Sequence, residues 1–375
     1  MFLRAVLLPF AWTRLLLLWV AWFGGQMSSS WSYPFPEAAR RGWSFLPGTA
    51  LDAFGRWDAH WYLDVAARGY ELRGALASVQ SNLAFFPLYP WAVRGLHALL
   101  PSAWQGEGSL YLCAIALSNG AALLGLWLLW RLAREVTGED DAASRTVLYA
   151  LLFPTGFILS AAYPESLFLL LSVGALLAAM RGRFLLAGGL GLLLALTRPG
   201  GVLVAVPLAW LAFTQGGPRR PAALLASALP GLGLAIHAAQ LWRITGDPLA
   251  LFHAQTAWGR SLAAPWRTLL HPREFHAWLG PLEAVALALV AALAAWLLAR
   301  RETRALGLWA LVSLLPVLLS GTMLSSTRFA AVIFPAFLAL GMLGRRPGLD
   351  RALVATFSLA QAVLFLFWSR FFWVA

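Results

Sequence analysis

SLYLCAIALSNGAALLGLWLLWR, residues 109–131, carries no charged residue before its final arginine. An α-helix needs about 20 apolar residues to cross the hydrocarbon core of a bilayer, so this stretch predicts a membrane-spanning helix. The composition of the whole chain agrees, since 60% of its residues are hydrophobic and only 12% are charged. A soluble domain carries about a quarter charged residues, so lipid must solvate much of this protein.

The same length criterion, applied along the whole chain, predicts about eleven spans. They lie near 5–24, 109–131, 145–161, 164–180, 184–198, 199–215, 222–242, 281–299, 305–320, 329–344 and 352–370. The first span is not followed by a small-x-small cleavage site, so we expect it to be retained. The stretches 184–198 and 199–215 also fit one long helix. The predicted fold class is an all-α polytopic membrane protein, with residues 1–375 in a single transmembrane domain.

Arginine residues gather in short loops between these spans, and loops of this kind face the cytoplasm. If all of them do so, the N-terminus is inside and the C-terminus outside. This topology requires a turn at Arg198-Pro199, and it requires that 83–100, which is rich in proline, form an interfacial helix instead of a span. Two external segments result, at roughly 26–108 and 243–280. The loop arginines are Arg131, Arg134, Arg145, Arg181, Arg183, Arg219, Arg220, Arg300, Arg301, Arg304, Arg345, Arg346 and Arg351.

The formal net charge of +12 raises the question of nucleic-acid binding. A nucleic-acid-binding protein concentrates its basic residues on one polar face or domain. Here they sit at the ends of apolar runs, where charge sets the orientation of a membrane protein. We therefore expect no nucleic-acid partner.

The first segment with chemical potential is FGRWDAHWYLDVAARGY, residues 54–70. On a helix, Asp64 and Arg68 are four residues apart, which favours a simple ion pair. Asp58 differs because it lies between two tryptophans and has no basic residue four positions on. A carboxylate among indoles near the membrane interface is costly unless something binds it. We therefore favour a functional role for Asp58, as a general base.

The second segment is AAYPESLF, residues 161–168, in which Pro164 suits the first turn of a helix. Glu165 then lies at the N-terminus of that helix, where the dipole alone would stabilise a carboxylate. The predicted topology places Glu165 on the same side of the membrane as Asp58, which favours a shared function over this structural reading.

Three arginines at the external edge are candidates for binding an anion. Arg198 in ALTRPGG, residues 195–201, precedes a glycine-rich helix opening that suits a phosphate, although a snorkelling arginine is the alternative. Arg260 lies in the second external segment, and Arg328 lies in SSTRF, residues 325–329. Arg14 lies deeper, within the first span, and must face protein or pair with an acid.

Two other features carry weaker predictions. The stretch NLAFFPLYPWAVR, residues 82–94, predicts a rigid external loop that enters an interfacial helix, which is equally consistent with structure or function. His253, His271 and His276 lack the tight spacing of a zinc site, so we expect no metal and no cofactor.

The candidate acids and arginines are all predicted on one side of the membrane, which suits an enzyme acting on a lipid-linked phosphate.

These residues together resemble the PIG-V family, whose eukaryotic members are the second mannosyltransferases of glycosylphosphatidylinositol anchor synthesis and which has bacterial relatives. The resemblance covers nearly the whole chain, and Trp57-Asp58 with the downstream Gly69-Tyr70 is its most specific part. The other residues that carry it are Arg56, Phe85, Phe86, Pro87, Leu88, Tyr89, Pro90, Tyr163, Pro164, Glu165, Arg198, Ser326, Thr327, Arg328 and Phe329.

The resemblance implies a GT-C glycosyltransferase fold in a bacterial inner membrane, with the active site outside. It implies transfer of mannose, with inversion, from a polyprenyl-phosphate-mannose donor to a hydroxyl of a lipid, glycan or protein acceptor. Asp58 would be the base and Trp57 would position it, while Glu165 would orient the acceptor or Asp58. Arg198 and Arg328 would bind the donor phosphate. The further candidate substrate contacts are Arg260, Tyr163, Trp61 and His60.

The main alternative is a polytopic transporter or flippase of a lipid-linked or anionic substrate, which many spans and the intramembrane Arg14 would allow. Against it, the sequence has no inverted repeat and no acid clearly at mid-membrane. An enzyme predicts one external cavity lined by the polar residues, a transporter predicts a path through the bilayer, and a scaffold protein predicts neither.

Overall fold

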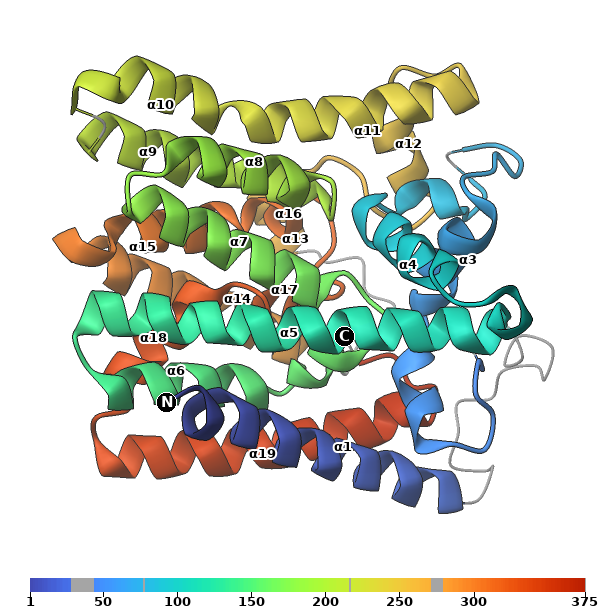
Figure 1. Ribbon diagram of the computed structural model, residues 1–375, viewed down its shortest axis with the longest axis horizontal. Coiled ribbons are helices and arrows are strands. Elements are labelled where there is room, and N and C mark those ends of the chain that lie inside the picture. Colours follow the sequence, from blue (N-terminus) through green and yellow to red (C-terminus); the bar gives the residue numbers. More distant parts are fainter. Residues whose placement is uncertain (28–43, 77, 216, 271–278, 375) are drawn as a thin grey trace.

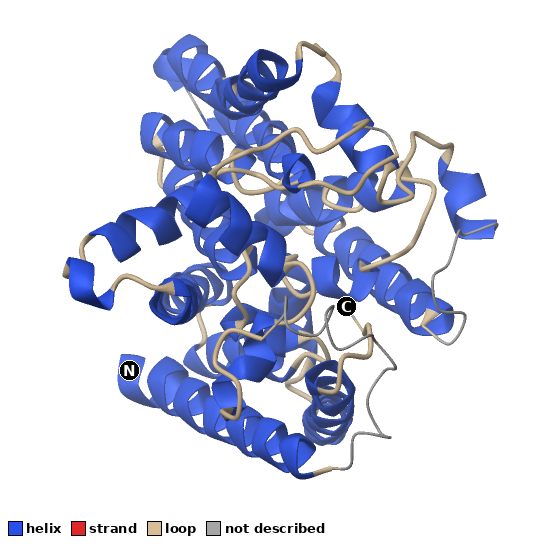
Figure 2. Ribbon diagram, turned by 90° about the vertical axis from the view of Figure 1, so that its right-hand side faces the viewer, coloured by secondary structure: helices blue, strands red, loops and turns tan. Residues whose placement is uncertain are grey.

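The computed structural model of the chain describes residues 1–27, 44–76, 78–215, 217–270 and 279–374 (Figures 1 and 2). Every regular element in these residues is a helix, so the predicted all-α class is confirmed. The long helices run side by side, roughly along the horizontal axis of Figure 1.

The helices fall into two groups by length. The longer ones, of ten or more residues, are α1 Leu8–Gln26, α3 Ala59–Arg68, α4 Leu88–Ala98, α5 Glu107–Thr137, α6 Asp140–Leu152, α7 Glu165–Met180, α8 Phe184–Ala195, α9 Ala205–Gln215, α11 Leu229–Thr245, α14 Gly280–Leu298, α18 Phe334–Leu343 and α19 Pro347–Ser369. The shorter ones are α10 Arg220–Ser227, α12 Ala250–Thr256, α13 Pro265–Leu270, α15 Arg304–Val312, α16 Leu315–Leu318 and α17 Ser326–Ala330. Short 3-10 or π segments are η1 Leu3–Leu7, η3 Ala50–Gly55, η4 Asn82–Ala84, η5 Ser102–Trp104, η6 Gly156–Ser160, η7 Pro199–Val204, η8 Gly217–Arg219 and η9 Arg301–Thr303.

Among the described residues, five helical segments are long and apolar enough to cross a membrane. They are Leu3–Gln26, Glu107–Thr137, Gly217–Thr245, Gly280–Leu298 and Pro347–Ser369. Four shorter apolar helices accompany them, namely Glu165–Met180, Phe184–Ala195, Pro199–Gln215 and Phe334–Leu343. The chain is therefore a multi-pass membrane protein, and each of the predicted spans contains helix.

Two of the predicted spans that are interrupted in the structure illustrate the effect of proline. The helix predicted at 145–161 ends at Leu152, because Pro154 removes a backbone donor and keeps Phe153 out of the helical conformation, with a ψ of 141°. The chain then continues as η6. The span predicted at 305–320 divides into α15 and α16, with Pro316 near the start of α16.

Two of the shorter apolar helices, α7 and α18, lie in the interior of the bundle. α7 packs between α5 and α8 and is buried along most of its length. Small residues permit this approach. A Cβ atom on Gly125 of α5 would lie 3.2 Å from the backbone of Leu170, and one on Gly341 of α18 would lie 2.3 Å from the Thr146 hydroxyl of α6. Surrounding protein, not lipid, therefore covers α7 and α18 along most of their length.

The loops sort to two ends of the bundle (Figure 1). The loops that join α5 to α6, α7 to α8, α9 to α10, α14 to α15 and α18 to α19, which hold the clustered arginines, lie at the left end. The helices α3, α4 and α12 lie at the right end. α8 and α9 are separate helices joined through η7, so a turn follows Arg198 as predicted. α4 has 11 residues, about 16 Å of helix, which is too short to cross a bilayer.

Candidate active site

Asp58 lies between η3 and α3, at the first position of the turn that opens α3. Aspartate at such a position usually caps its own helix. Here the carboxylate makes no capping bond, and Oδ2 instead accepts a hydrogen bond of 2.7 Å from Nη1 of Arg328 on α17. The side chain of Asp58 is only 13% exposed. Asp58 and the cationic groups therefore meet at one buried position.

A chain of ion pairs continues from Arg328 into the protein. Nε of Arg328 lies 3.3 Å from Oε1 of Glu165, and Nη1 of Arg198 donates a hydrogen bond of 2.9 Å to the same oxygen. Glu165 begins α7 and is 1% exposed. Glu165 thus lies behind the two arginines and orients their guanidinium groups, and it acts on Asp58 only through Arg328.

Tyr163 supports the backbone next to Asp58. Its hydroxyl donates a hydrogen bond of 2.9 Å to the carbonyl of Arg56 and accepts one of 2.8 Å from the backbone N–H of Asp58. Tyr163 is completely buried and does not line the adjoining pocket. The sequence placed Tyr163 among the substrate contacts, whereas the structure gives it this supporting position, because its hydroxyl is used by the loop.

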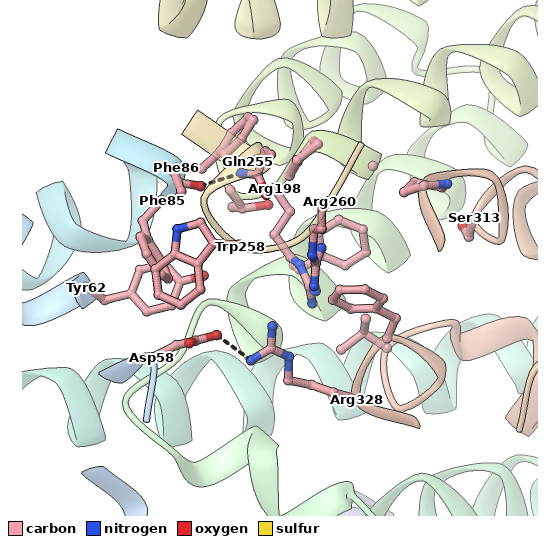
Figure 3. Close-up of a pocket in the computed structure, with 18 of the residues that line it drawn as sticks. Asp58, Tyr62, Phe85, Phe86, Arg198, Gln255, Trp258, Arg260, Ser313 and Arg328 are labelled. Carbon is pink, nitrogen blue, oxygen red and sulfur yellow. Dashed lines mark hydrogen bonds and ion pairs between the residues drawn. The ribbon is translucent and has the colours of Figure 1, made fainter. Parts of the chain in front are cut away.

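An open pocket of about 930 Å³, counting its mouth, lies beside the ion pair (Figure 3). One side of it is polar and the other is apolar and aromatic. Its lining residues are Asp58, Tyr62, Ala84, Phe85, Phe86, Phe168, Thr197, Arg198, Pro199, Gly200, Gln255, Trp258, Arg260, Ser313, Pro316, Arg328, Phe329, Val332 and Ile333. Four of the predicted site residues, Asp58, Arg198, Arg260 and Arg328, therefore share one cavity.

Arg260 differs from the other two arginines of the pocket. No carboxylate pairs with it among the residues that the structure describes. Burial, together with the positive charge of Arg328, lowers the pKa of Arg260 to about 10, which leaves it charged at neutral pH. All three guanidinium groups approach the Phe329 ring, at 4.3, 5.3 and 5.5 Å from its centroid. Three cations and two carboxylates leave the site with one excess positive charge, which favours an anionic ligand.

The aromatic side chains of Phe85, Phe86 and Trp258 form the opposite wall, and none of the three was a candidate substrate contact from the sequence. The Phe85 ring stacks on Trp61 at 5.9 Å and meets the edge of Trp258 at 5.4 Å. Gln255 fixes this wall by donating a hydrogen bond of 2.9 Å to the Ala84 carbonyl (Figure 3). Interfacial aromatic residues are common in membrane proteins, so only the closeness of Trp258 to Arg260 in sequence could have drawn attention to it.

Besides Glu165 and Tyr163, three predicted site residues adjoin this pocket without lining it. Trp61 supports Phe85 from behind, and His60 packs against Trp61 with ring centroids 5.5 Å apart. Trp57 has a φ of 59°, a left-handed conformation that is rare for a bulky residue, and its ring meets the edge of Trp373 at 5.1 Å. Their side chains shape the site from behind its walls.

The predicted ion pair between Asp64 and Arg68 is confirmed. Asp64 also receives hydrogen bonds from Asn82, at 2.8 Å, and from Arg73, at 3.3 Å. This network attaches the loop that follows α3 to that helix, and it is structural.

Arg14 faces protein, as expected for a cation within a span. Its Nε donates a hydrogen bond of 2.7 Å to the Ser160 hydroxyl, its guanidinium lies over the Phe10 ring, and no acid pairs with it among the described residues.

No three His, Cys, Asp or Glu side chains cluster as metal ligands within the described part of the chain. His253 is hydrogen-bonded to Asp247 at 2.6 Å. His271 and His276 lie outside the described residues.

Comparison with known proteins identifies relatives of part of the chain. A family described as mannosyltransferase (PIG-V) matches residues 35–219. GPI mannosyltransferase 2 of Yarrowia lipolytica is 38% identical over 119 residues, which cover 32% of this chain and 33% of that enzyme. The matched stretch thus spans about one third of the length of this relative.

Among solved structures, the Archaeoglobus fulgidus oligosaccharyltransferase AglB, in complex with an inhibitory peptide and a dolichol-phosphate, superposes with a TM-score of 0.47 at 14% identity. The apo form of the oligosaccharyltransferase from the same organism gives a TM-score of 0.46. Both superpositions cover 96% of this chain and 55% of the other, so the chain spans about half of their length.

Proposed function

We propose that this chain belongs to the PIG-V mannosyltransferase family, whose model matches residues 35–219, and on that basis we propose the reaction and its catalytic residues. The proposed reaction moves mannose from a polyprenyl-phosphate donor to a hydroxyl group of a lipid, glycan or protein, with inversion at the anomeric carbon. The arrangement of Asp58 with Arg198, Arg260 and Arg328 around one pocket is the observation that supports it.

Asp58 is the proposed general base. The acceptor oxygen attacks C1 of mannose, its proton passes to the Asp58 carboxylate, and the bond between C1 and the phosphate oxygen breaks. Oδ2 of Asp58 is held by Arg328, whereas Oδ1 has no partner among the described residues and is the oxygen that takes the proton. Trp57 and Tyr163 hold the backbone from which this carboxylate projects.

The three arginines of the pocket are the proposed phosphate site. The leaving polyprenyl phosphate gains negative charge as the C1–O bond breaks, and guanidinium groups stabilise that charge most strongly in a buried site. Arg260 has no carboxylate partner among the described residues and can bind the phosphate directly. Glu165 orients Arg198 and Arg328 toward the same phosphate. The apolar residues Pro316, Val332 and Ile333 line the same pocket, which suits the first isoprene units of the donor.

We place this site on the non-cytoplasmic face of a GT-C fold, in a bacterial plasma membrane. The separation of the arginine loops from α3, α4 and α12 supports this orientation, because clustered arginines remain in the cytoplasm. α3 and α4 would then be the juxtamembrane helices of the first external segment.

The decisive experiment measures transfer of radiolabelled mannose from polyprenyl-phosphate-mannose to fractionated envelope lipids, glycans and proteins by the purified chain in liposomes. We expect Asp58→Asn to lower kcat by about a thousandfold, the usual contribution of a general base. Asp141→Asn, at an exposed acid near the start of α6, is the matched control and should transfer normally. Near-normal turnover by Asp58→Asn would remove Asp58 as the base.

A further inference from the structure

The chain folds back on itself after the end of α19. Phe371 adopts a left-handed φ of 63°, and the backbone N–H of Phe372 returns to the carbonyl of Phe367 at 3.0 Å. Arg370 donates a hydrogen bond of 3.0 Å to the Gly24 carbonyl at the end of α1, and Val374 is 1% exposed. The segment 370–374 is therefore packed into the protein, although it lies beyond the last helix.

This segment packs against the two residues that precede Asp58. The guanidinium carbon of Arg56 lies 4.2 Å from the centroid of the Phe371 ring. The ring of Trp373 meets Trp57 edge to face, with centroids 5.1 Å apart and an interplanar angle of 87°. Phe371 and Trp373 thus contact Arg56 and Trp57, the first two residues of the catalytic loop, which we define as residues 56–58.

The contact at Trp57 affects the direction in which Asp58 projects. A bulky residue with positive φ persists only where its surroundings hold it, and such conformations concentrate at functional sites. Trp373 supplies packing on that ring, and the Arg328 guanidinium lies 6.0 Å from its centroid. One indole therefore contacts both Trp57, the residue before Asp58, and Arg328, the partner of Asp58.

We propose that the segment 370–374 is a positioning element of the active site, and that Trp373 is its main residue. Trp373 holds Trp57 in its left-handed conformation, and so fixes the Asp58 carboxylate opposite Arg328. Trp373 does not line the pocket, so it acts through Trp57 and not by contact with substrate. The expected effect on turnover rests on the proposed function.

The chemistry of the contact predicts which substitution is tolerated. The indole N–H of Trp373 is buried without a hydrogen-bond partner among the described residues, so the aromatic ring itself makes the contact. Trp373→Phe keeps an aromatic edge against Trp57, whereas Trp373→Leu and Trp373→Ala remove it.

We expect Trp373→Ala and Trp373→Leu to lower kcat for mannose transfer by about tenfold, with KM for the donor unchanged, and Trp373→Phe to restore most of the rate. Trp104→Ala removes an exposed indole beyond α4 and should behave as wild type. Trp373→Leu, which keeps apolar bulk, decides the result if Trp373→Ala does not accumulate. A wild-type kcat in Trp373→Leu would overturn the proposal.

A second readout does not depend on catalysis. The chain has one cysteine, so Cys113→Ser gives a background in which Ala59→Cys, at a completely buried position beside Asp58, can be labelled with a maleimide. Adding Trp373→Leu should raise the labelling rate at least several-fold, and adding Trp373→Phe should not. Equal rates would overturn the inference, even if the wild-type protein transfers no mannose and the proposed function fails.

Discussion

Asp58 and Arg328 stand 270 positions apart in the chain, yet their side chains share a hydrogen bond of 2.7 Å. The same guanidinium also reaches Glu165, so Arg328 contacts both buried carboxylates of the site. These two charges oppose the desolvation that acts on Arg328, and its pKa is raised above the ordinary arginine value. Arg328 therefore remains charged at neutral pH.

Arg328→Met should remove both the phosphate contact and the partner of Asp58. Losing one donor at a site of developing negative charge costs about a hundredfold to a thousandfold in kcat. Breaking a buried ion pair also costs about 3–5 kcal/mol of stability, because it leaves the carboxylates unpaired. Turnover and thermal unfolding in detergent measure the two effects.

Arg328→Lys separates charge from geometry. An ammonium group is a single point charge and cannot reproduce the two contacts made by Nη1 and Nε. We expect stability close to wild type with kcat still reduced by at least about tenfold. Full activity in this variant would show that charge alone suffices and that the bridging geometry is unimportant.

Arg260→Gln should weaken donor binding without unfolding the protein, because no carboxylate is left unpaired. A hydrogen bond to a charged group contributes about 1.5–3 kcal/mol, so kcat/KM for the donor should fall by roughly tenfold to a hundredfold. Arg243→Gln, at an exposed arginine near the end of α11, is the control and should leave kcat/KM unchanged. An unchanged KM for the donor in Arg260→Gln would exclude Arg260 from the phosphate site.

The parts of the fold that were predicted from the sequence are those that depend on local patterns. An apolar run identifies a span wherever it lies in the chain, and the basic loops beside the spans predicted the common end that Figure 1 shows. The spans at 145–161 and 305–320 were drawn too long, because a hydropathy criterion does not weigh Pro154 and Pro316.

Site residues were predicted one at a time, and their relationships required the fold. Asp58 stood out as a carboxylate between two tryptophans and Arg328 as a cation that opens a span, but nothing in the sequence pairs them. Tyr163 was a candidate substrate contact because Tyr163-Pro164-Glu165 belongs to the family resemblance, and in the structure its hydroxyl bonds the backbone around Asp58. Nothing in the sequence indicated that Trp373 lies near the site, because its contact with Trp57 depends on the reversal of the chain at Phe371.

Tyr163→Phe should reduce turnover through the backbone of the Asp58 loop. Without the hydroxyl, the buried N–H of Asp58 loses its acceptor, which costs about 1–3 kcal/mol of stability. Tyr149→Phe is a matched control, because its hydroxyl is also hydrogen-bonded, to Asp350 at 2.6 Å, but at the arginine-rich end of the bundle. Both variants should lower the melting temperature, and only Tyr163→Phe should lower kcat. Equal kcat values in the two variants would contradict this role.

The stability of the segment before the catalytic loop should depend on pH through Asp52. Burial alone would raise the pKa of this carboxyl, but the charge of Arg56 and the backbone N–H groups of Leu46 and Phe45 outweigh burial and lower it. The folded pKa is then below the unfolded one, so the stabilisation is complete above the unfolded value, about 4, and is lost as pH falls through the folded value. Thermal unfolding in detergent between pH 7 and pH 3 measures this effect, and Asp52→Asn should flatten the acid limb of the curve. An acid limb unchanged by Asp52→Asn would assign the loss of stability to another carboxyl group.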